Sequence, residues 1–168
     1  MCRSSRATSK LGAWNTLLTL AAVLAASVSP ALGHRLPGAE VTIENAEIDG
    51  EAKSAFTIRL HAEDVLKLLG RELDLDVDLT DPELHQIAGG KVLTKVQLES
   101  GALQFFGGSV EGNSVYLFFT ADANAQVRDA RILSSVFDRW TNRINDVRAE
   151  DVQTKVFTQG GELHGHRH

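Results

Sequence analysis

Hydrophobic and polar residues alternate with a period of two along much of the chain, which is the pattern of half-buried β-strands. The clearest runs are residues 55–62, 92–99 and 152–158. In residues 115–120 both sets of alternate positions are apolar, which is typical of a central strand covered on both faces. The positions that this alternation predicts to be buried are Phe56, Ile58, Leu60, Val96, Leu98, Val115, Leu117, Phe119 and Val156.

Turn-forming residues separate these runs. Asp49-Gly50, Ser100-Gly101 and Gly112-Asn113 each lie between two predicted strands, and their residue types tolerate the positive φ that tight hairpins need. Three hairpins within about 80 residues favour an antiparallel sheet. The apolar phase slips near Glu44-Asn45, which predicts a bulge there, and Gly107-Gly108-Ser109 predicts a bend or bulge inside a strand.

Two segments have helical rather than strand spacing. Residues 63–70 carry acidic residues in the first turn, apolar residues at helical spacing and a terminal glycine, which predicts a helix of two turns. Residues 81–89 begin with Asp81 as a cap and Pro82 at the first helical position, and they end in Gly89. The whole pattern therefore predicts a mainly β fold: an antiparallel, immunoglobulin-like β-sandwich of seven or eight strands with one or two short inserted helices.

The first 33 residues differ from the rest of the chain. Basic residues at positions 3, 6 and 10 precede an apolar run and then the small residues Ala31 and Gly33, which is the three-part pattern of a secretory signal peptide. Cleavage after Gly33 leaves His34 first, and cleavage after Ala31 is the alternative. The predicted organisation is a signal peptide over residues 1–33, a β-sandwich domain over 34–161 and a flexible, histidine-rich tail over 162–168.

Net charge and cysteine content limit which partners and which cellular compartment we expect. Removing residues 1–33 leaves 14 basic and 22 acidic residues, a net charge of −8, and such a surface repels nucleic acid. The single cysteine, Cys2, lies within the predicted signal peptide, so no disulfide stabilises the domain. We expect a periplasmic or secreted protein with no transmembrane segment after cleavage, and an envelope or membrane protein as its partner.

Histidines suggest one chemical activity. A histidine at a free amino terminus offers both its amine and its ring nitrogen to a metal ion, so His34 is a candidate ligand for Cu(II). His61 and His85 are candidates to complete that site. The tail supplies a second candidate metal site, formed by His164, His166 and His168.

A polar and aromatic cluster near the end of the chain suggests a partner surface. Trp140 lies beside Asn142 and Arg143, and an aromatic residue next to directional polar groups is the composition of a binding hot spot. The alternative is that Trp140 fills one end of the sandwich. No catalytic motif for nucleophilic or metal-dependent hydrolysis is present in the sequence.

The order of these segments resembles a family of small exported bacterial proteins that is known mainly as a domain of unknown function. The points of likeness are His34 after the signal, the strand-to-helix passage at residues 58–65, the segment 110–117, and residues 136–145 before a final strand. The resemblance implies an envelope location and a layout similar to the exported portion of some metal-transporter proteins. It implies no activity and no catalytic residue.

Three functions are compatible with these observations. The first is an exported, non-enzymatic accessory or interaction module. The second is a periplasmic copper-binding or other metal-binding protein that uses the N-terminal histidine. The third is an enzyme of unrecognised type.

Overall fold

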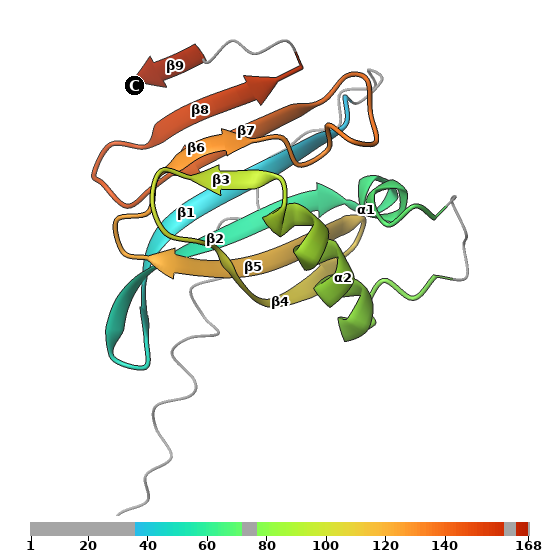
Figure 1. Cartoon of the computed structure of the whole chain (residues 1–168), viewed down its shortest axis with the longest axis horizontal. Helices are drawn as coiled ribbons and strands as arrows, with labels where there is room; N and C mark the ends of the chain where they lie inside the picture. The colour runs from blue at the N-terminus through green and yellow to red at the C-terminus, as the bar shows by residue number, and fades with distance from the viewer. Residues whose placement is uncertain (1–35, 72–76, 160–163, 168) are drawn as a thin grey trace, which may run out of the picture. The chain divides into compact units, whose positions relative to one another are not determined.

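The structure, a computed structural model, describes residues 36–71, 77–159 and 164–167 as nine strands and two helices (Figure 1). In chain order the elements are β1 (Gly38–Ile48), β2 (Glu51–His61), α1 (Ala62–Leu68), α2 (Pro82–Leu93), β3 (Val96–Leu98), β4 (Gln104–Glu111), β5 (Ser114–Asp122), β6 (Val127–Ala130), β7 (Thr141–Asp146), β8 (Gln153–Thr158) and β9 (His164–Arg167).

Seven strands form one large sheet in the order β4-β5-β2-β1-β7-β8-β9. Asp49 and Gly50 both have positive φ, 54° and 79°, and close the β1–β2 hairpin as predicted. Neighbouring strands are antiparallel except β1 and β7, which pair in parallel with Val41 opposite Ile144. The strands at the two edges are β4 and β9.

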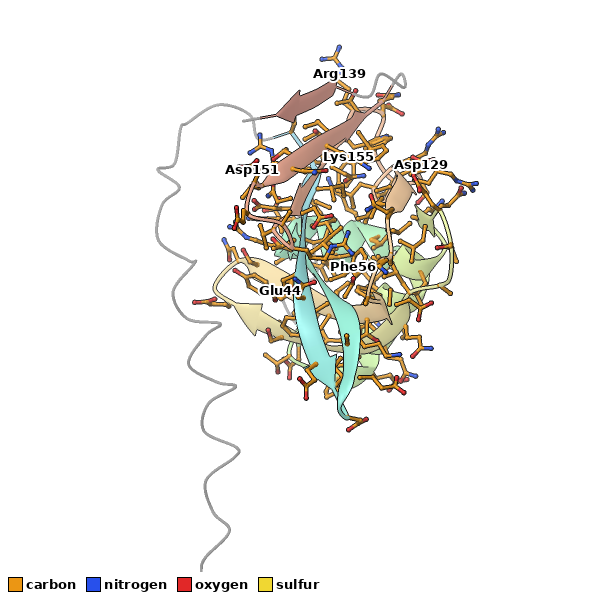
Figure 2. The ribbon with its side chains drawn as sticks, turned by 90° about the vertical axis from the view of Figure 1, so that its left-hand side faces the viewer. Glu44, Phe56, Asp129, Arg139, Asp151 and Lys155 are labelled. Carbon is orange, nitrogen blue, oxygen red and sulfur yellow. The ribbon has the colours of Figure 1, made fainter. Side chains whose placement is uncertain are left out.

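A second, smaller layer covers one face of this sheet. It contains the two-stranded sheet of β3 and β6 together with helix α2, which Figure 1 shows lying across the large sheet. Figure 2 shows the layers from the side, with Phe56 on the core side of β2 and Glu44 on the opposite side of β1. The buried residues from the large sheet include Val41, Ile43, Phe56, Ile58, Leu60, Val115, Leu117 and Phe119, and those from the second layer include Ala88, Val92, Val96, Val127 and Ala130.

The predicted mainly β, sandwich-like fold with two short helices is confirmed. It differs from the predicted sandwich in two respects, because one strand pair is parallel and because a helix replaces part of the second sheet. Ser100-Gly101 does not close a hairpin, since β3 pairs with β6 while β4 pairs with β5. The predicted bulge at Glu44-Asn45 is also wrong: β1 and β2 pair without a register shift there.

Both predicted helices are present. Helix α1 is followed by Gly70, whose φ is 73°, and α2 begins at Pro82 with Asp81 accepting a hydrogen bond from the backbone N–H of Glu83 at 2.9 Å. Helix α2 is longer than predicted, because it continues past Gly89 to Leu93. Val92, predicted to start a strand, is therefore a buried helical residue that packs in the core.

Seven of the nine residues predicted to be buried are buried, and two differ. Leu98 is only partly buried against the core. On β8 the prediction has the wrong phase: Phe157 is 8 % exposed and lies opposite Asn142 on the core side, so Val156 faces the other side of the sheet. The outward positions of β5 are only half-buried, so that strand is not covered on both faces by the described residues.

The end of the chain also differs from the predicted flexible tail. His164–Arg167 forms β9, which pairs antiparallel with β8. A physical reason is that β8 would otherwise present unpaired backbone groups at the sheet edge. The predicted signal peptide lies outside the described residues.

No helix among the described residues is long and apolar enough to cross a membrane.

Candidate functional site

The histidines predicted to bind metal are not brought together by the described part of the structure. His34 and His168 lie outside the described residues. His164 and His166 are alternate residues of β9, opposite Val156 and Thr154 of β8. Residues 36–71, 77–159 and 164–167 contain no group of three or more histidine, cysteine or acidic side chains arranged to hold a metal ion.

The predicted partner surface at Trp140, Asn142 and Arg143 is not a shared surface. Trp140 is 7 % exposed and belongs to the core, and Asn142 is fully buried, with its Nδ2 donating to the carbonyl oxygen of Ala130 at 2.6 Å. Only Arg143 is exposed. The reason is strand alternation, because β7 turns Asn142 toward the core and Arg143 toward the opposite face.

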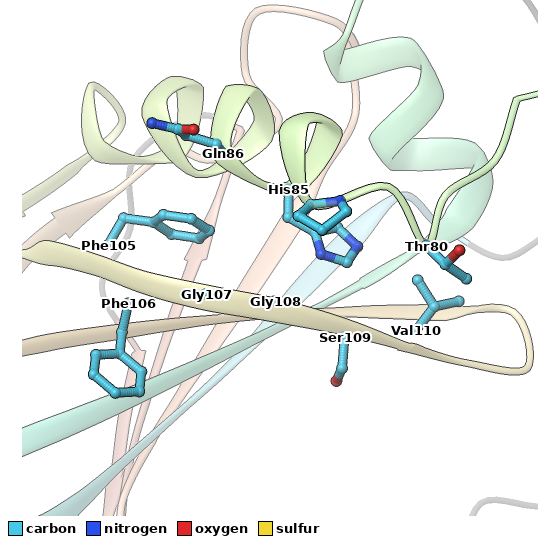
Figure 3. A pocket seen from close by; sticks show the side chains of 10 residues that line it. Thr80, His85, Gln86, Phe105, Phe106, Gly107, Gly108, Ser109 and Val110 are labelled. Atoms are coloured by element: carbon cyan, nitrogen blue, oxygen red, sulfur yellow. The ribbon is translucent and has the colours of Figure 1, made fainter.

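A groove lies between helix α2 and edge strand β4 (Figure 3). It encloses about 580 Å³, within the range of ~300–1,000 Å³ found for ligand clefts. One side is formed by the start of α2 and the turn before it, and the other by β4. The lining residues are Thr80, Pro82, His85, Gln86 and residues 105–110.

The start of α2 is fixed by local interactions that also shape the groove. Asp81 caps the helix, and the backbone N–H and hydroxyl of Thr80 both donate to Asp78 Oδ1, at 2.9 and 2.6 Å. These hydrogen bonds lower the pKa of Asp78, so this carboxylate stays ionised at neutral pH. The first turn of the helix is thereby held in place above β4.

His85 lies between the helix and the strand. Its Nε2 is 2.7 Å from the carbonyl oxygen of Leu79. Because a carbonyl oxygen only accepts hydrogen bonds, Nε2 carries the proton and Nδ1 is the acceptor in the neutral ring. The ring is 6 % exposed and packs against the backbone at Gly108. His85 is therefore a buried contact residue rather than the surface residue or metal ligand considered from the sequence.

Glycines allow the helix and the strand to approach each other closely. A Cβ added at Gly108 would lie 2.8 Å from Cγ of His85, and one added at Gly89 would overlap the ring of Phe105. Gly89 of α2 therefore lies against the ring of Phe105 on β4, and Gly108 of β4 lies against the ring of His85 on α2. Phe105 in turn contacts Phe119 edge to face, with ring centroids 5.4 Å apart, which anchors β4 to the core.

A bulge in β4 exposes an aromatic ring beside the groove. Phe105 pairs with Phe119 and Gly107 with Phe118, so Phe106 is the extra residue, which confirms the irregularity predicted at the glycines. Bulges re-aim side chains. Phe106 is 72 % exposed, the most exposed large hydrophobic residue in the described chain, and in Figure 3 it points away from Phe105 and His85.

Hydroxyl groups lie on both sides of the groove. Ser109 is the only lining residue with a nucleophilic hydroxyl on the strand side, and Figure 3 shows its side chain on the opposite side of β4 from His85. On the helix side, the hydroxyl of Thr80 donates to Asp78 Oδ1, and Asp78 does not line the groove. The lining also offers apolar surface, a buried imidazole and the edge of strand β4.

Polar side chains on the opposite face of the large sheet form a row of hydrogen-bonded pairs. Arg59 donates to Ser114 Oγ at 3.2 Å and to Glu40 Oε2 at 3.4 Å. Asn145 donates to Glu40 Oε1 at 3.2 Å and accepts from the hydroxyl of Thr154 at 3.1 Å. These side chains link β5, β2, β1, β7 and β8 in a row, so they contribute to strand register.

Sequence reasoning did not identify the groove as a site. The glycine pair at 107 and 108 was the available signal, because glycine inside a strand marks a bulge or a close approach of another element. Comparison with protein-family models, curated proteins and solved structures gives no match for this chain. The groove is therefore judged by its own geometry and chemistry.

Proposed function

We propose that this chain is an exported, non-enzymatic interaction module that binds its partner in the groove between α2 and β4. The observation that carries the proposal is that the free edge of β4 borders a groove of about 580 Å³ with an exposed phenylalanine beside it. Exposed aromatic residues next to a hollow are typical of protein interaction sites. The lining of the groove is mostly apolar and carries no Asp, Glu, Lys or Arg, which favours binding over catalysis.

Export to the periplasm or beyond is part of this proposal. It is supported by the basic start, apolar run and small residues within positions 1–33, and by the resemblance to small exported bacterial proteins. An envelope or membrane protein is the partner that fits this location. The acidic character of the chain disfavours nucleic acid as a partner.

Metal binding is the second candidate function. One observation favours it: His164 and His166 are two residues apart in the sequence of β9. His34 would act separately, as an amino-terminal chelate for copper. This candidate needs no contribution from the groove, so the two functions can be tested independently.

Photocrosslinking tests the interaction module. A p-benzoylphenylalanine residue at position 106, in cells that naturally make the protein, should form a covalent adduct with a partner of one defined mass. The control places the same residue at Ile87, which is 44 % exposed on α2 but does not line the groove. Equal adducts at both positions, or none at position 106, would refute the groove as the binding site.

A further inference from the structure

The free edge of β4 presents backbone groups that no described strand satisfies. β4 pairs with β5 on one side only, and it is the first strand of the large sheet. In an edge strand alternate residues direct their N–H and C=O groups outward, where another strand can pair with them. Charged residues on an edge strand oppose such pairing, and β4 has only one among its eight residues, Glu111 at its end.

The groove lies along this edge and would accommodate the side chains of an added strand. Side chains of a strand alternate between two faces. One set would enter the groove beneath His85 and Gln86, and the other set would lie beside Phe106 on the opposite face. Gly107 leaves room for this approach, because a Cβ at that position would have no atom within 4 Å.

Charge limits which segment can bind. None of the ten lining residues is Asp, Glu, Lys or Arg, so a charged side chain within the groove would be desolvated without a partner. Acidic residues instead adjoin one end, where Figure 3 shows Thr80 close to Val110. These exposed acids, next to the lining residues in sequence, are Asp78, Asp81, Glu83 and Glu111.

The geometry points to strand addition: an extended, uncharged segment of a partner protein, followed at one end by a basic residue, pairs with the edge of β4. This inference rests on the proposed function, and it specifies the binding mode and the chemistry of the partner. Main-chain hydrogen bonds to β4 supply the affinity. The groove selects uncharged side chains, and the acids beside Thr80 and Val110 select the basic residue.

A second copy of the chain is the competing occupant. Two β4 edges could pair with each other, but each copy without residues 1–33 carries a net charge of −8. The acids at the end of one groove would then lie against acids or against an uncharged strand of the other copy. Like charges brought together in this way oppose association. A foreign segment with a basic end fits the charge pattern better than β4 itself does.

The test uses ¹⁵N-labelled protein and the peptide acetyl-Val-Thr-Val-Thr-Val-Lys-amide as the probe. Binding should shift the amide resonances of residues 107–110 and Gln86 in a saturable way, and should slow hydrogen exchange at alternate amides of β4. Replacing the peptide lysine with glutamate should weaken binding at low ionic strength. Methylating every peptide amide nitrogen removes the donors, and should abolish the slowed exchange.

Two protein variants complete the test. Gly107→Lys adds a charged side chain at the edge and should weaken peptide binding about tenfold. Gly90→Lys is the matched control, because a Cβ at Gly90 also has no atom within 4 Å and Gly90 does not line the groove. Its affinity for the peptide should stay within about twofold of the unmodified protein.

Each alternative outcome overturns the inference in a distinguishable way. Strand addition fails if the methylated peptide binds as well as the parent peptide. It also fails if the peptide shifts no resonance of residues 107–110 while the crosslink at position 106 still forms. In both cases the proposal of an interaction module is unaffected. If sedimentation shows a dimer that Gly107→Lys dissociates, the occupant is a second copy. If neither crosslink nor peptide binding occurs, both proposals fail.

Discussion

The imidazole of His85 packs directly on the backbone of Gly108, so that helix α2 and strand β4 approach closely at a point where one residue has a ring and the other has no side chain. The hydrogen bond from His85 Nε2 to Leu79 restrains the ring, and it cannot move aside without losing that bond. The geometry of the groove therefore depends on this pair.

Gly108→Val should destabilise the protein by ~1–3 kcal/mol, since the added Cβ would overlap a ring that is held in place. Gly107→Val, at the neighbouring position with open space, should change stability by no more than ~0.5 kcal/mol. Urea denaturation measures both. Combining Gly108→Val with His85→Ala should cost less than the sum of the two single variants, and strict additivity would show that the two residues do not interact.

Asp146 and Arg148 give the protein a pH-dependent contribution to stability. Burial alone raises the pKa of Asp146, but hydrogen bonds from the side chain and backbone of Arg148, together with its positive charge, outweigh this and hold the pKa below its ordinary value of 3.8. Arg148 Nη2 lies 2.6 Å from Asp146 Oδ2, and Nη1 donates to Ser54 Oγ at 2.7 Å and to the Ala123 carbonyl oxygen at 3.1 Å. These hydrogen bonds connect the end of β7, where Asp146 lies, to Ser54 on β2 and to Ala123 just after β5.

Because the folded-state pKa of Asp146 is lowered, its contribution is fully present above pH 3.8 and is lost as the pH falls through the lowered value. Asp146→Asn should therefore cost ~1–3 kcal/mol at pH 7, since it leaves the part-buried Arg148 without its carboxylate. The difference from the unmodified protein should shrink below pH 3.8. Urea denaturation at a series of pH values measures it, and a difference that stays constant down to pH 2 would contradict the linkage.

Local sequence signals predicted the parts of the fold that depend on local structure. Asp49-Gly50 identified the β1–β2 hairpin, and Asp81-Pro82 identified the start of α2, because turn and cap chemistry act over a few residues. The parallel pairing of β1 with β7 joins Val41 to Ile144 across about a hundred residues, and no local pattern encodes it. The wrong phase at Val156 arose because residues 152–158 are partly apolar on both faces.

The groove between α2 and β4 was not predicted, because it too depends on contacts between residues that are far apart in sequence. His85 and Gly108 are 23 positions apart in sequence, and neither carries a motif, so only the packing of α2 on β4 brings them together. The polar neighbours of Trp140 suggested a partner surface, and the alternative prediction, that Trp140 fills one end of the sandwich, fits its buried position. The structure shows that a tryptophan beside Asn142 and Arg143 can lie in the core, since strand alternation separates neighbours onto opposite faces.

Substitutions of Trp140 and of Arg143 should have different effects on the stability of the protein. Trp140→Ala removes a large core side chain and should cost ~3–5 kcal/mol. Arg143→Ala removes an exposed side chain and should change stability by no more than ~0.5 kcal/mol. Thermal and urea denaturation check both. Equal, small effects of the two substitutions would contradict the buried position of Trp140.

The amino terminus offers a prediction that is independent of the groove. If cleavage after Gly33 leaves His34 first, the protein should bind one Cu(II) ion through the terminal amine and the imidazole, and more tightly than Zn(II), because copper is higher in the affinity order of divalent metals. Both nitrogens must be deprotonated to coordinate, so binding should weaken as the pH falls below ~6.5, the pKa of free imidazole.

Calorimetric titration with Cu(II) tests this chelate in a protein that begins at His34 and ends at Gly161, so that the tail histidines do not contribute. The control is the same protein with its amino terminus acetylated, which removes the terminal amine as a donor while leaving the domain unchanged. Copper affinity should fall sharply in the acetylated protein, because imidazole alone is a single ligand. The same affinity in both proteins would rule out the chelate, and the tail histidines would remain the metal-binding candidates to test in the full-length chain.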